Sequence, residues 1–219
     1  SATGRDRIGV EINNLIIAGW AGRDAAAIEH HIEELAALGI PRPSTTPVYY
    51  RVAAANLSQA ERFVVLGPDS SGEVEPFIVS LADGLWVGLG SDHTDRKAEA
   101  VGIALSKQLC GKPVGTQLWR YEEIEAHWDR LILRAYATID GVRMLYQESA
   151  VASLRTPRDL IRKLTGSDTL PVGTAMYCGT PGAIGGIRPA TRFEMELEDP
   201  VLGRTLRHAY DVEVLPVVS

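Results

Sequence analysis

The chain has 219 residues, of which 45% are hydrophobic and 23% are charged, a composition typical of a globular protein with one sizeable core. The formal net charge of −6 gives no positive field that would collect nucleic acid or an anionic membrane surface. No apolar run in the sequence approaches the roughly 20 residues that a membrane-spanning helix needs. We therefore expect neither a nucleic acid nor a membrane as its partner.

The N-terminal part of the sequence predicts short strands and one helix. Residues 8–20 form two apolar runs around an Asn-Asn pair, which indicates two strands joined by a turn. Asp24 precedes a run with apolar residues at helical spacing, and a glycine and a proline follow that run, so we expect a helix capped by Asp24. The proline-rich residues 41–47 predict an extended connector to the next strand.

The rest of the chain predicts mainly sheet. Residues 62–90 contain three apolar runs separated by turn sequences, and residues 130–149 predict a hairpin around an Asp-Gly pair. Helical spacing recurs in residues 97–110, and residues 156–166 begin with the Thr-Pro of a capped helix. The glycine-rich residues 173–216 predict strands and turns. The expected fold class is therefore α+β, mostly β, with short helices.

The cysteine content points to a reducing compartment. Cys110 and Cys178 are too few for a disulfide framework and lack metal-ligand spacing. Each is expected to be a small buried apolar residue rather than a nucleophile. The N-terminal residues also lack the basic-then-apolar layout of a secretion signal. The predicted location is the cytoplasm.

Acidic residues mark the ends of two predicted strands. Glu73 and Glu75 lie two positions apart, so an extended backbone points both side chains to one face. The following strand returns the chain and brings Asp92 toward the same end of the sheet. Carboxylates side by side need compensation, and their oxygens are ligands that Mg²⁺ and Mn²⁺ prefer. The spacing therefore predicts a metal site, with His93 and Asp95 as further candidate ligands and a solvated strand end as the alternative.

Two histidine–glutamate pairs lie on the predicted first helix. His31 and Glu34 are three positions apart and share one face of that helix. Such a pair can act as a general base, because the carboxylate fixes the tautomer of the imidazole. His30 and Glu33 repeat the pattern one step round, so spacing leaves both pairs open, along with a simple surface hydrogen bond. Lys107 lies in an apolar helical stretch, where it is either a functional amine or a stem that carries its charge to solvent.

The order of these motifs resembles the fumarylacetoacetate hydrolase superfamily over residues 17–216, most clearly in the second half of the chain. The motifs that carry the resemblance are His-x-x-Glu with His31 and Glu34, Glu-x-Glu with Glu73 and Glu75, Asp-x-Thr-x-Arg with Asp92, Thr94 and Arg96, a helical lysine as Lys107, a glutamine after a hairpin turn as Gln147, and Gly-Thr-Pro with Thr180. Within that superfamily the sequence is similar to an uncharacterised bacterial group, DUF2848.

The resemblance implies a twisted β-roll that works as a homodimer. In it, residues 1–60 form an N-terminal segment with strands and the His/Glu helix, and residues 61–219 form the catalytic roll, in one compact unit. The resemblance also implies roles for the matching residues: Glu73, Glu75 and Asp92 hold Mg²⁺ or Mn²⁺, His31, Glu34 and Lys107 are catalytic, and Arg96, Gln147 and Thr180 bind a small carboxylic acid.

The implied function is a metal-dependent hydrolase or lyase of a small 2-oxo or 2,4-dioxo acid. Cleavage of a carbon–carbon bond beside a carbonyl leaves an enolate, which a divalent cation stabilises, while the His/Glu pair activates water. A decarboxylase, an isomerase or a dehydratase could use the same site. A non-catalytic module that binds a small acid is a further alternative, as is a purely structural cation.

The sequence departs from the pattern of the superfamily at three places. The stretch between Glu75 and Asp92 is shorter than usual, and Lys97 stands where an aspartate is common. Gly173 and Thr174 replace a common Gly-Asp pair before the Gly-Thr-Pro strand. We therefore expect a divergent branch, and the substrates of other members are not carried over to this chain.

Overall fold

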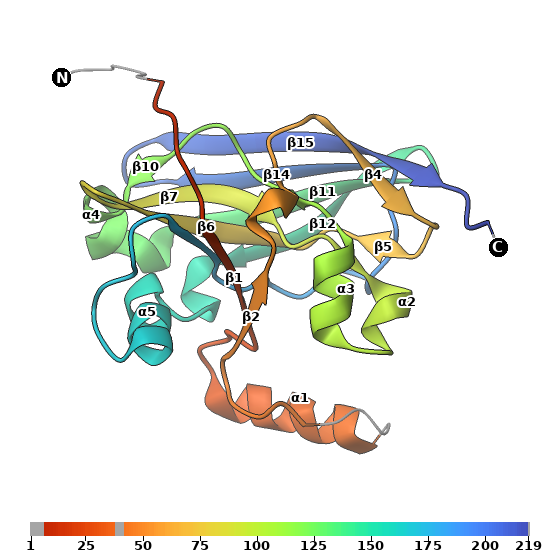
Figure 1. Cartoon of the computed structure of the whole chain (residues 1–219), viewed down its shortest axis with the longest axis horizontal. Coiled ribbons are helices and arrows are strands. Elements are labelled where there is room, and N and C mark those ends of the chain that lie inside the picture. The colour runs from red at the N-terminus through yellow and green to blue at the C-terminus, as the bar shows by residue number, and fades with distance from the viewer. Residues whose placement is uncertain (1–6, 38–41, 219) are drawn as a thin grey trace.

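The computed structural model describes residues 7–37 and 42–218, and two β-sheets form its body (Figure 1). In spatial order, the six-stranded sheet contains β10 (Trp119–Arg120), β7 (Gly84–Ser91), β6 (Val74–Leu81), β13 (Thr174–Tyr177), β1 (Asn14–Gly19) and β2 (Val48–Val52). The five-stranded sheet contains β12 (Val142–Ala150), β11 (Ile132–Ile139), β14 (Arg192–Asp199), β15 (Arg204–Leu215) and β4 (Arg62–Leu66).

Short elements complete the fold around these sheets. Two small strand pairs join β3 (Leu57–Ser58) to β9 (Lys112–Pro113) and β5 (Ser70–Ser71) to β8 (Thr94–Asp95). The α-helices are α1 (Ala25–Ala37), α2 (Arg96–Glu99), α3 (Ile103–Leu109), α4 (Tyr121–Ile124) and α5 (Pro157–Thr165). Three 3₁₀ turns are η1 (Ala54–Asn56), η2 (Glu125–Arg130) and η3 (Val151–Ser153). The predicted α+β fold, mostly β with short helices, is confirmed.

The main core joins the facing sides of the two sheets. Its buried residues include Ile78, Leu89 and Met176 from the six-stranded sheet and Phe193 and Tyr210 from the five-stranded sheet. A second cluster covers the other face of the six-stranded sheet and includes Leu15, Ile17, Phe77, Val79 and Tyr177. Because β6 contributes to both clusters, almost its whole length is buried, which explains its continuous apolar sequence.

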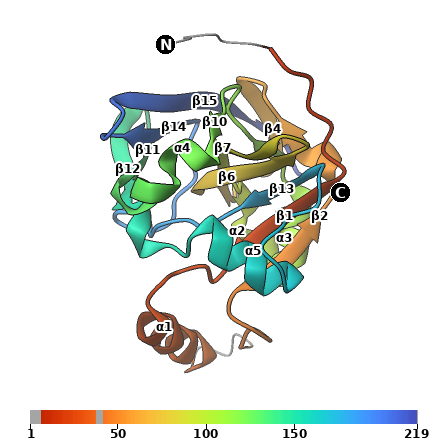
Figure 2. The ribbon, with the colours of Figure 1, turned by 90° about the vertical axis from the view of Figure 1, so that its left-hand side faces the viewer.

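The helix caps agree with the sequence. Asp24 Oδ1 accepts hydrogen bonds from the backbone N–H groups of Ala26 and Ala27, at 2.9 and 3.0 Å, and so caps α1. Thr156 caps α5 in the same way, and Gly166 ends it in the left-handed conformation, with φ of 72°. Helix α1 extends away from the two sheets, while α5 lies against the six-stranded sheet (Figures 1 and 2). The glycine and proline expected to end α1 lie outside the described residues.

Two predicted elements are wrong. Residues 8–13 form no strand, because β1 already has β13 and β2 as its neighbours. The backbone N–H groups of Asn13 and Asn14 both donate to Gly173 O instead of forming a hairpin turn. The single helix expected over residues 97–110 is two helices, α2 and α3, separated around Gly102. The hairpin of β11 and β12 is confirmed, with its Asp-Gly pair at positive φ.

Strands from both sides of the predicted boundary between residues 60 and 61 share the six-stranded sheet, and the boundary itself stays a prediction. Within residues 7–37 and 42–218, every helix is too short or too polar to cross a membrane.

Candidate functional site

Three acidic side chains meet at one end of the β6–β7 hairpin. Glu73 immediately precedes β6, Glu75 lies within it, and Asp92 immediately follows β7. The backbone N–H of Asp92 donates to Glu73 O at 3.0 Å, so the hairpin register places the first and the last of them side by side. One carboxylate oxygen from each residue lies within 4.8 Å of the other two. We call Glu73, Glu75 and Asp92 the acidic triad.

The acidic triad is buried on one side and open on the other. Asp92 is 0% exposed and Glu75 is 2% exposed. The side chain of Glu73 is 17% exposed and forms the solvent side of the group. A ligand would therefore approach from the side of Glu73.

Three cationic side chains surround the triad. Lys107 Nζ, from α3, bonds to Asp92 Oδ2 and lies 3.7 Å from Glu73 Oε2. Lys112 Nζ lies 3.2 Å from Asp92 Oδ1 and donates to His93 O at 2.5 Å. Arg96, at the start of α2, lies 2.8 Å from Glu73 Oε1. These three positive charges balance the three carboxylates of the triad, and Arg96 also pairs with the partly exposed Glu99 at 3.0 Å.

Burial and these neighbours shift the pKa values in different directions. Burial raises the pKa of Glu75 well above its usual value, and the charges of Asp92 and Glu73 raise it further. Burial acts the same way on Asp92, but Lys107 and Lys112 outweigh it and hold its pKa below the usual value. Burial lowers the pKa of Lys112, whereas Asp92 and Glu73 reverse that effect for Lys107 and raise its pKa. Of the two fully buried carboxyl groups, Glu75 is therefore the one that favours its protonated form and Asp92 the one that favours its ionised form.

The loop after β13 also bonds to the triad, through Glu75. The backbone N–H of Gly179 donates to Glu75 Oε2 at 2.6 Å. Thr180 Oγ1 donates to Val74 O at 2.9 Å and accepts from Gln147 Nε2 at 2.8 Å. Gln147 Nε2 also donates to Pro181 O at 2.6 Å, and Gln147 Oε1 accepts the backbone N–H of Val74 at 3.1 Å. Gln147 and Thr180 therefore fasten the Gly-Thr-Pro loop to the start of β6.

The further candidate ligands point elsewhere. His93 bonds through both ring nitrogens, to Tyr210 and Ser70 in the core. Burial lowers the pKa of His93 to about 3, so its imidazole is neutral. Asp95 Oδ1 accepts the backbone N–H of Ala98 at 2.8 Å and so caps α2. Neither side chain joins the acidic triad.

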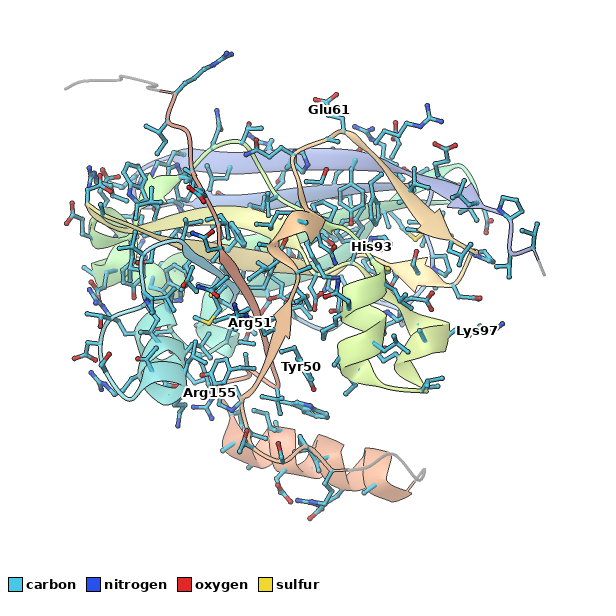
Figure 3. The ribbon with its side chains drawn as sticks, viewed as in Figure 1. Tyr50, Arg51, Glu61, His93, Lys97 and Arg155 are labelled. Carbon is cyan, nitrogen blue, oxygen red and sulfur yellow. The ribbon has the colours of Figure 1, made fainter. Side chains whose placement is uncertain are left out.

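Of the other residues singled out in the sequence, the structure places Lys107 and Lys97 but not the side chains of the predicted general base. Lys107 is 6% exposed, so the alternative in which its charge reaches solvent is wrong. Lys97 is exposed and points outward from α2 (Figure 3). His31 and Glu34 lie on α1, and their side chains lie outside the described part of the structure. Their role as a general base stays a prediction.

Sequence reasoning missed two groups that contact the triad. Lys112 is 0% exposed, although a lysine between a glycine and a proline normally indicates an exposed turn. The sequence signal that could have indicated this contact is that Lys112 follows Lys107 closely, in the segment that returns to the sheet. Gly179 contributes only its backbone N–H, at φ of 98°, a conformation that favours glycine. The glycine that begins the Gly-Thr-Pro motif was the signal for this second group.

The residues present fit a divalent cation. Carboxylate oxygens in a cluster of this size are the donors that Mg²⁺ and Mn²⁺ prefer. Asp92 Oδ1 is buried and accepts no hydrogen bond from the described residues, although Lys112 Nζ lies 3.2 Å away as its ion-pair partner, so this oxygen keeps a lone pair that a cation could use. Lys107 bridges Asp92 and Glu73, and its ammonium would have to move aside, or share these oxygens, for a cation to enter.

Comparisons with known proteins identify the family and the fold. Residues 18–210 match the family described as "Protein of unknown function (DUF2848)", so the chain belongs to that family. A comparison with curated protein sequences finds no match. The resemblance stated from the sequence is therefore confirmed at the level of the family.

Solved structures of two other proteins share the fold. Crystal structures of Cg1458 include one that is 18% identical, with a TM-score of 0.65, and the match covers 95% of this chain and 78% of that one. A hexagonal form of 2-keto-3-deoxyarabinonate dehydratase is 15% identical, with a TM-score of 0.67 and coverage of 99% and 83%. The structure described as 2-keto-3-deoxy-D-arabinonate dehydratase complexed with magnesium and 2,5-dioxopentanoate is 15% identical, with a TM-score of 0.66, and the match covers 94% of this chain and 75% of that one. At these identities the likeness establishes a shared fold.

Proposed function

We propose that this chain is a divalent-metal-dependent enzyme that acts on a small 2-oxo or 2,4-dioxo carboxylic acid. The observation that carries the proposal is the acidic triad, three carboxylates within 4.8 Å at the end of a buried hairpin. The fold it shares with a dehydratase complexed with magnesium and 2,5-dioxopentanoate supports the choice of metal and of substrate class. Glu73, Glu75 and Asp92 are the proposed ligands of Mg²⁺ or Mn²⁺.

The side chains around the triad have complementary proposed roles. A divalent cation held there supplies a Lewis acid that stabilises negative charge developing on a substrate carbonyl oxygen. Lys107 keeps its positive charge beside that position and attracts the carboxylate of the acid. Arg96 already pairs with Glu73, and Gln147 already bonds to the Gly-Thr-Pro loop. We propose that each of them positions its partner and also binds the acid. We propose that Thr180, which is half-buried and whose hydroxyl bonds to Val74 O and to Gln147, also contacts the acid.

Our first candidate reaction is hydrolytic or lytic cleavage of a carbon–carbon bond, with His31 and Glu34 activating water. A dehydratase is the second candidate, favoured by Lys107, because dehydration requires proton transfer but no attacking water. Decarboxylation and isomerisation use the same enolate, and a non-catalytic acid-binding module is the remaining alternative. A homodimer in the cytoplasm is the proposed assembly and location.

Metal binding is the first test. Wild type and Glu75→Gln are melted with and without Mn²⁺, and each is then melted with Mn²⁺ and oxalate, a small mimic of a 2-oxo acid. A ligand at about 100 times its Kd stabilises the folded state by roughly 2.7 kcal/mol. In a chain of this length that corresponds to a rise in Tm of about 5–10 °C. Glu194→Gln, a change on the outer face of the five-stranded sheet, is the matched control.

The second measurement identifies the chemistry. Proton NMR in D₂O follows exchange at C3 of a panel of 2-oxo acids, because every candidate reaction passes through an enolate. The products then distinguish cleavage from dehydration. Metal-dependent exchange that Glu75→Gln abolishes and Glu194→Gln retains is the expected result. Absence of both metal binding and exchange in the wild type would refute the proposed function, and binding of oxalate without any exchange would favour the binding module.

A further inference from the structure

A chain of hydrogen bonds behind the acidic triad joins the two sheets. Ser70 Oγ lies 2.9 Å from His93 Nε2, and His93 Nδ1 lies 3.0 Å from the Tyr210 hydroxyl. Tyr210 donates to Ser91 Oγ at 2.9 Å. Ser91 Oγ also accepts the backbone N–H of Glu73, at 3.1 Å. The chain therefore runs from β5 through β15 to a residue of the triad.

The direction of these bonds fixes the tautomer of His93. A tyrosine hydroxyl has one proton, and Tyr210 gives it to Ser91. Tyr210 must then accept its second bond from His93, whose Nδ1 carries the proton. The neutral imidazole has an acceptor at Nε2, and Ser70 donates to it. Each polar atom of the imidazole is thus satisfied in one arrangement.

This series of hydrogen bonds includes the residues immediately before and after Asp92 in the sequence. Ser91 and His93 flank Asp92, and both bond to the hydroxyl of Tyr210. Ser91 in addition holds the backbone of Glu73, the triad member that immediately precedes the facing strand β6. A single hydroxyl from the five-stranded sheet therefore fixes the backbone at two members of the acidic triad.

Water cannot easily replace these bonds. Ser91 and Tyr210 are 0% exposed, His93 is 2% exposed and lies inside the body of the molecule (Figure 3). The ring of Phe63 packs edge-on against His93 and Tyr210, with centroid distances of 4.7 and 5.5 Å. Loss of the hydroxyl would leave buried donors and acceptors without partners, so the neighbouring backbone would have to shift.

We propose that Tyr210 is a positioning residue whose hydroxyl, acting through His93 and Ser91, orients Asp92 and Glu73 to hold a divalent cation. This inference rests on the proposed function, because it assumes that the triad binds the cation. Groups that orient metal ligands from outside the ligand set typically change metal affinity or activity by about 10–100-fold when they are removed. Tyr210 belongs to this class, although it lies on a different sheet from the ligands.

The test compares two variants that each lose one buried tyrosine hydroxyl. Tyr210→Phe removes the hydroxyl and keeps the ring. Tyr146→Phe is the matched control, since Tyr146 is 1% exposed and its hydroxyl bonds to the backbone of Arg188 rather than to His93 or Ser91. Calorimetric titration with Mn²⁺ should show the Kd of Tyr210→Phe raised about 10–100-fold over the wild type, and that of Tyr146→Phe unchanged.

The outcomes separate this inference from the proposed function. If wild type and Tyr210→Phe bind Mn²⁺ equally, the inference is overturned while the proposed function stands, even if Tyr210→Phe melts at a lower temperature. If the wild type binds no Mn²⁺, the inference is overturned, and the proposed function is overturned with it when exchange at C3 of the 2-oxo acids is also absent. Nitrogen NMR of wild-type His93 should show the Nδ1–H tautomer, and the Nε2–H tautomer would overturn the inference independently. Should Tyr210→Phe fail to fold, Ser70→Ala removes the far end of the chain, and an unchanged Mn²⁺ Kd in that variant would overturn it.

Discussion

Replacement of Asp92 by asparagine tests the buried charge arrangement directly. The amide has nearly the shape of the carboxylate, so Asp92→Asn removes one negative charge and little volume. Asp92 is 0% exposed and contacts Lys107 and Lys112, which are 6% and 0% exposed. Lys107 retains Glu73 at 3.7 Å as a second partner. For Lys112, Asp92 is the carboxylate within ion-pair distance among the described residues, so Lys112 is the group most affected.

The expected loss of stability follows from this geometry. At 3.2 Å and an effective dielectric constant of about 20, the attraction between Lys112 and Asp92 is about 5 kcal/mol. The variant can instead neutralise Lys112, which costs about 5 kcal/mol at pH 7 for a lysine with the ordinary pKa. Removal of one partner of a buried pair costs about 3–5 kcal/mol in other proteins. We therefore expect Asp92→Asn to lower the free energy of unfolding by about 3–5 kcal/mol at pH 7.

The pH dependence makes this prediction specific. Neutralising a lysine costs only about 2 kcal/mol at pH 9, so the stability difference between wild type and Asp92→Asn should shrink as the pH rises. Urea unfolding at pH 7 and pH 9, in EDTA, measures both values. Asp129→Asn is the control, because its pair with Arg23 is exposed and worth less than about 1 kcal/mol. An Asp92→Asn protein as stable as the wild type at pH 7 would refute the buried arrangement.

Two further substitutions test supports elsewhere in the fold. Gly179→Ala places a Cβ 2.7 Å from Ala21 Cβ at a φ of 98°, so we expect about 1–3 kcal/mol of destabilisation and, because Gly179 N–H bonds to Glu75, weaker Mn²⁺ binding in the same titration. Asp199 is buried, and hydrogen bonds from backbone N–H groups and His127 outweigh burial and lower its pKa. The contribution of ionised Asp199 to folding stability is therefore present above the pKa of Asp199 in the unfolded state and is lost as the pH falls through its lower pKa in the folded state. Asp199→Asn should lower the free energy of unfolding by about 1–3 kcal/mol at pH 7. The stability difference between wild type and Asp199→Asn should vanish at acid pH, and unfolding followed by circular dichroism over the pH range measures it.

The parts of the site that follow from local geometry were predictable from sequence. The alternation of a strand places Glu73 and Glu75 on one face, and the short turn after β6 returns the chain so that Asp92 ends beside them. The caps at Asp24 and Thr156 are equally local, since a side-chain oxygen bonds to a backbone N–H a few positions later. Each of these predictions depends on the chain within one hairpin or one helical turn.

The remaining features depend on contacts between distant segments. The parallel pairing of β1 with β13 brings Asn14 beside Thr174, and it is this partner that removes the expected N-terminal hairpin. Lys112 is charged and flanked by turn residues, so only its approach to Asp92 in the folded chain explains its burial. Tyr210 reads as an ordinary apolar position of β15, and the sequence has no signal that its hydroxyl reaches the end of another sheet.

The charge of the site bears on which state of the substrate it favours. With these six side chains ionised, the three carboxylates of the acidic triad balance Lys107, Lys112 and Arg96, while Glu99, the second partner of Arg96, lies at the partly exposed edge. These six side chains and a bound divalent cation together carry two positive charges, and a 2-oxo acid with one negative charge offsets only half of that excess. In the proposed reaction a second negative charge would develop as the enolate forms, so the electrostatic complementarity of the site would be greatest toward the transition state.

This charge balance predicts a preference between two small acids. In the presence of Mn²⁺, oxalate, a dianion with the shape of the pyruvate enolate, should bind at least about 100-fold more tightly than pyruvate, a monoanion. Lys112→Met makes the cluster one charge more negative and should reduce that ratio, while Arg62→Met, which removes an exposed cation on β4, should leave it unchanged. Calorimetric titration of Mn²⁺-loaded protein with each acid measures the ratio. Equal affinities for oxalate and pyruvate would show that the buried cations do not select the more highly charged state.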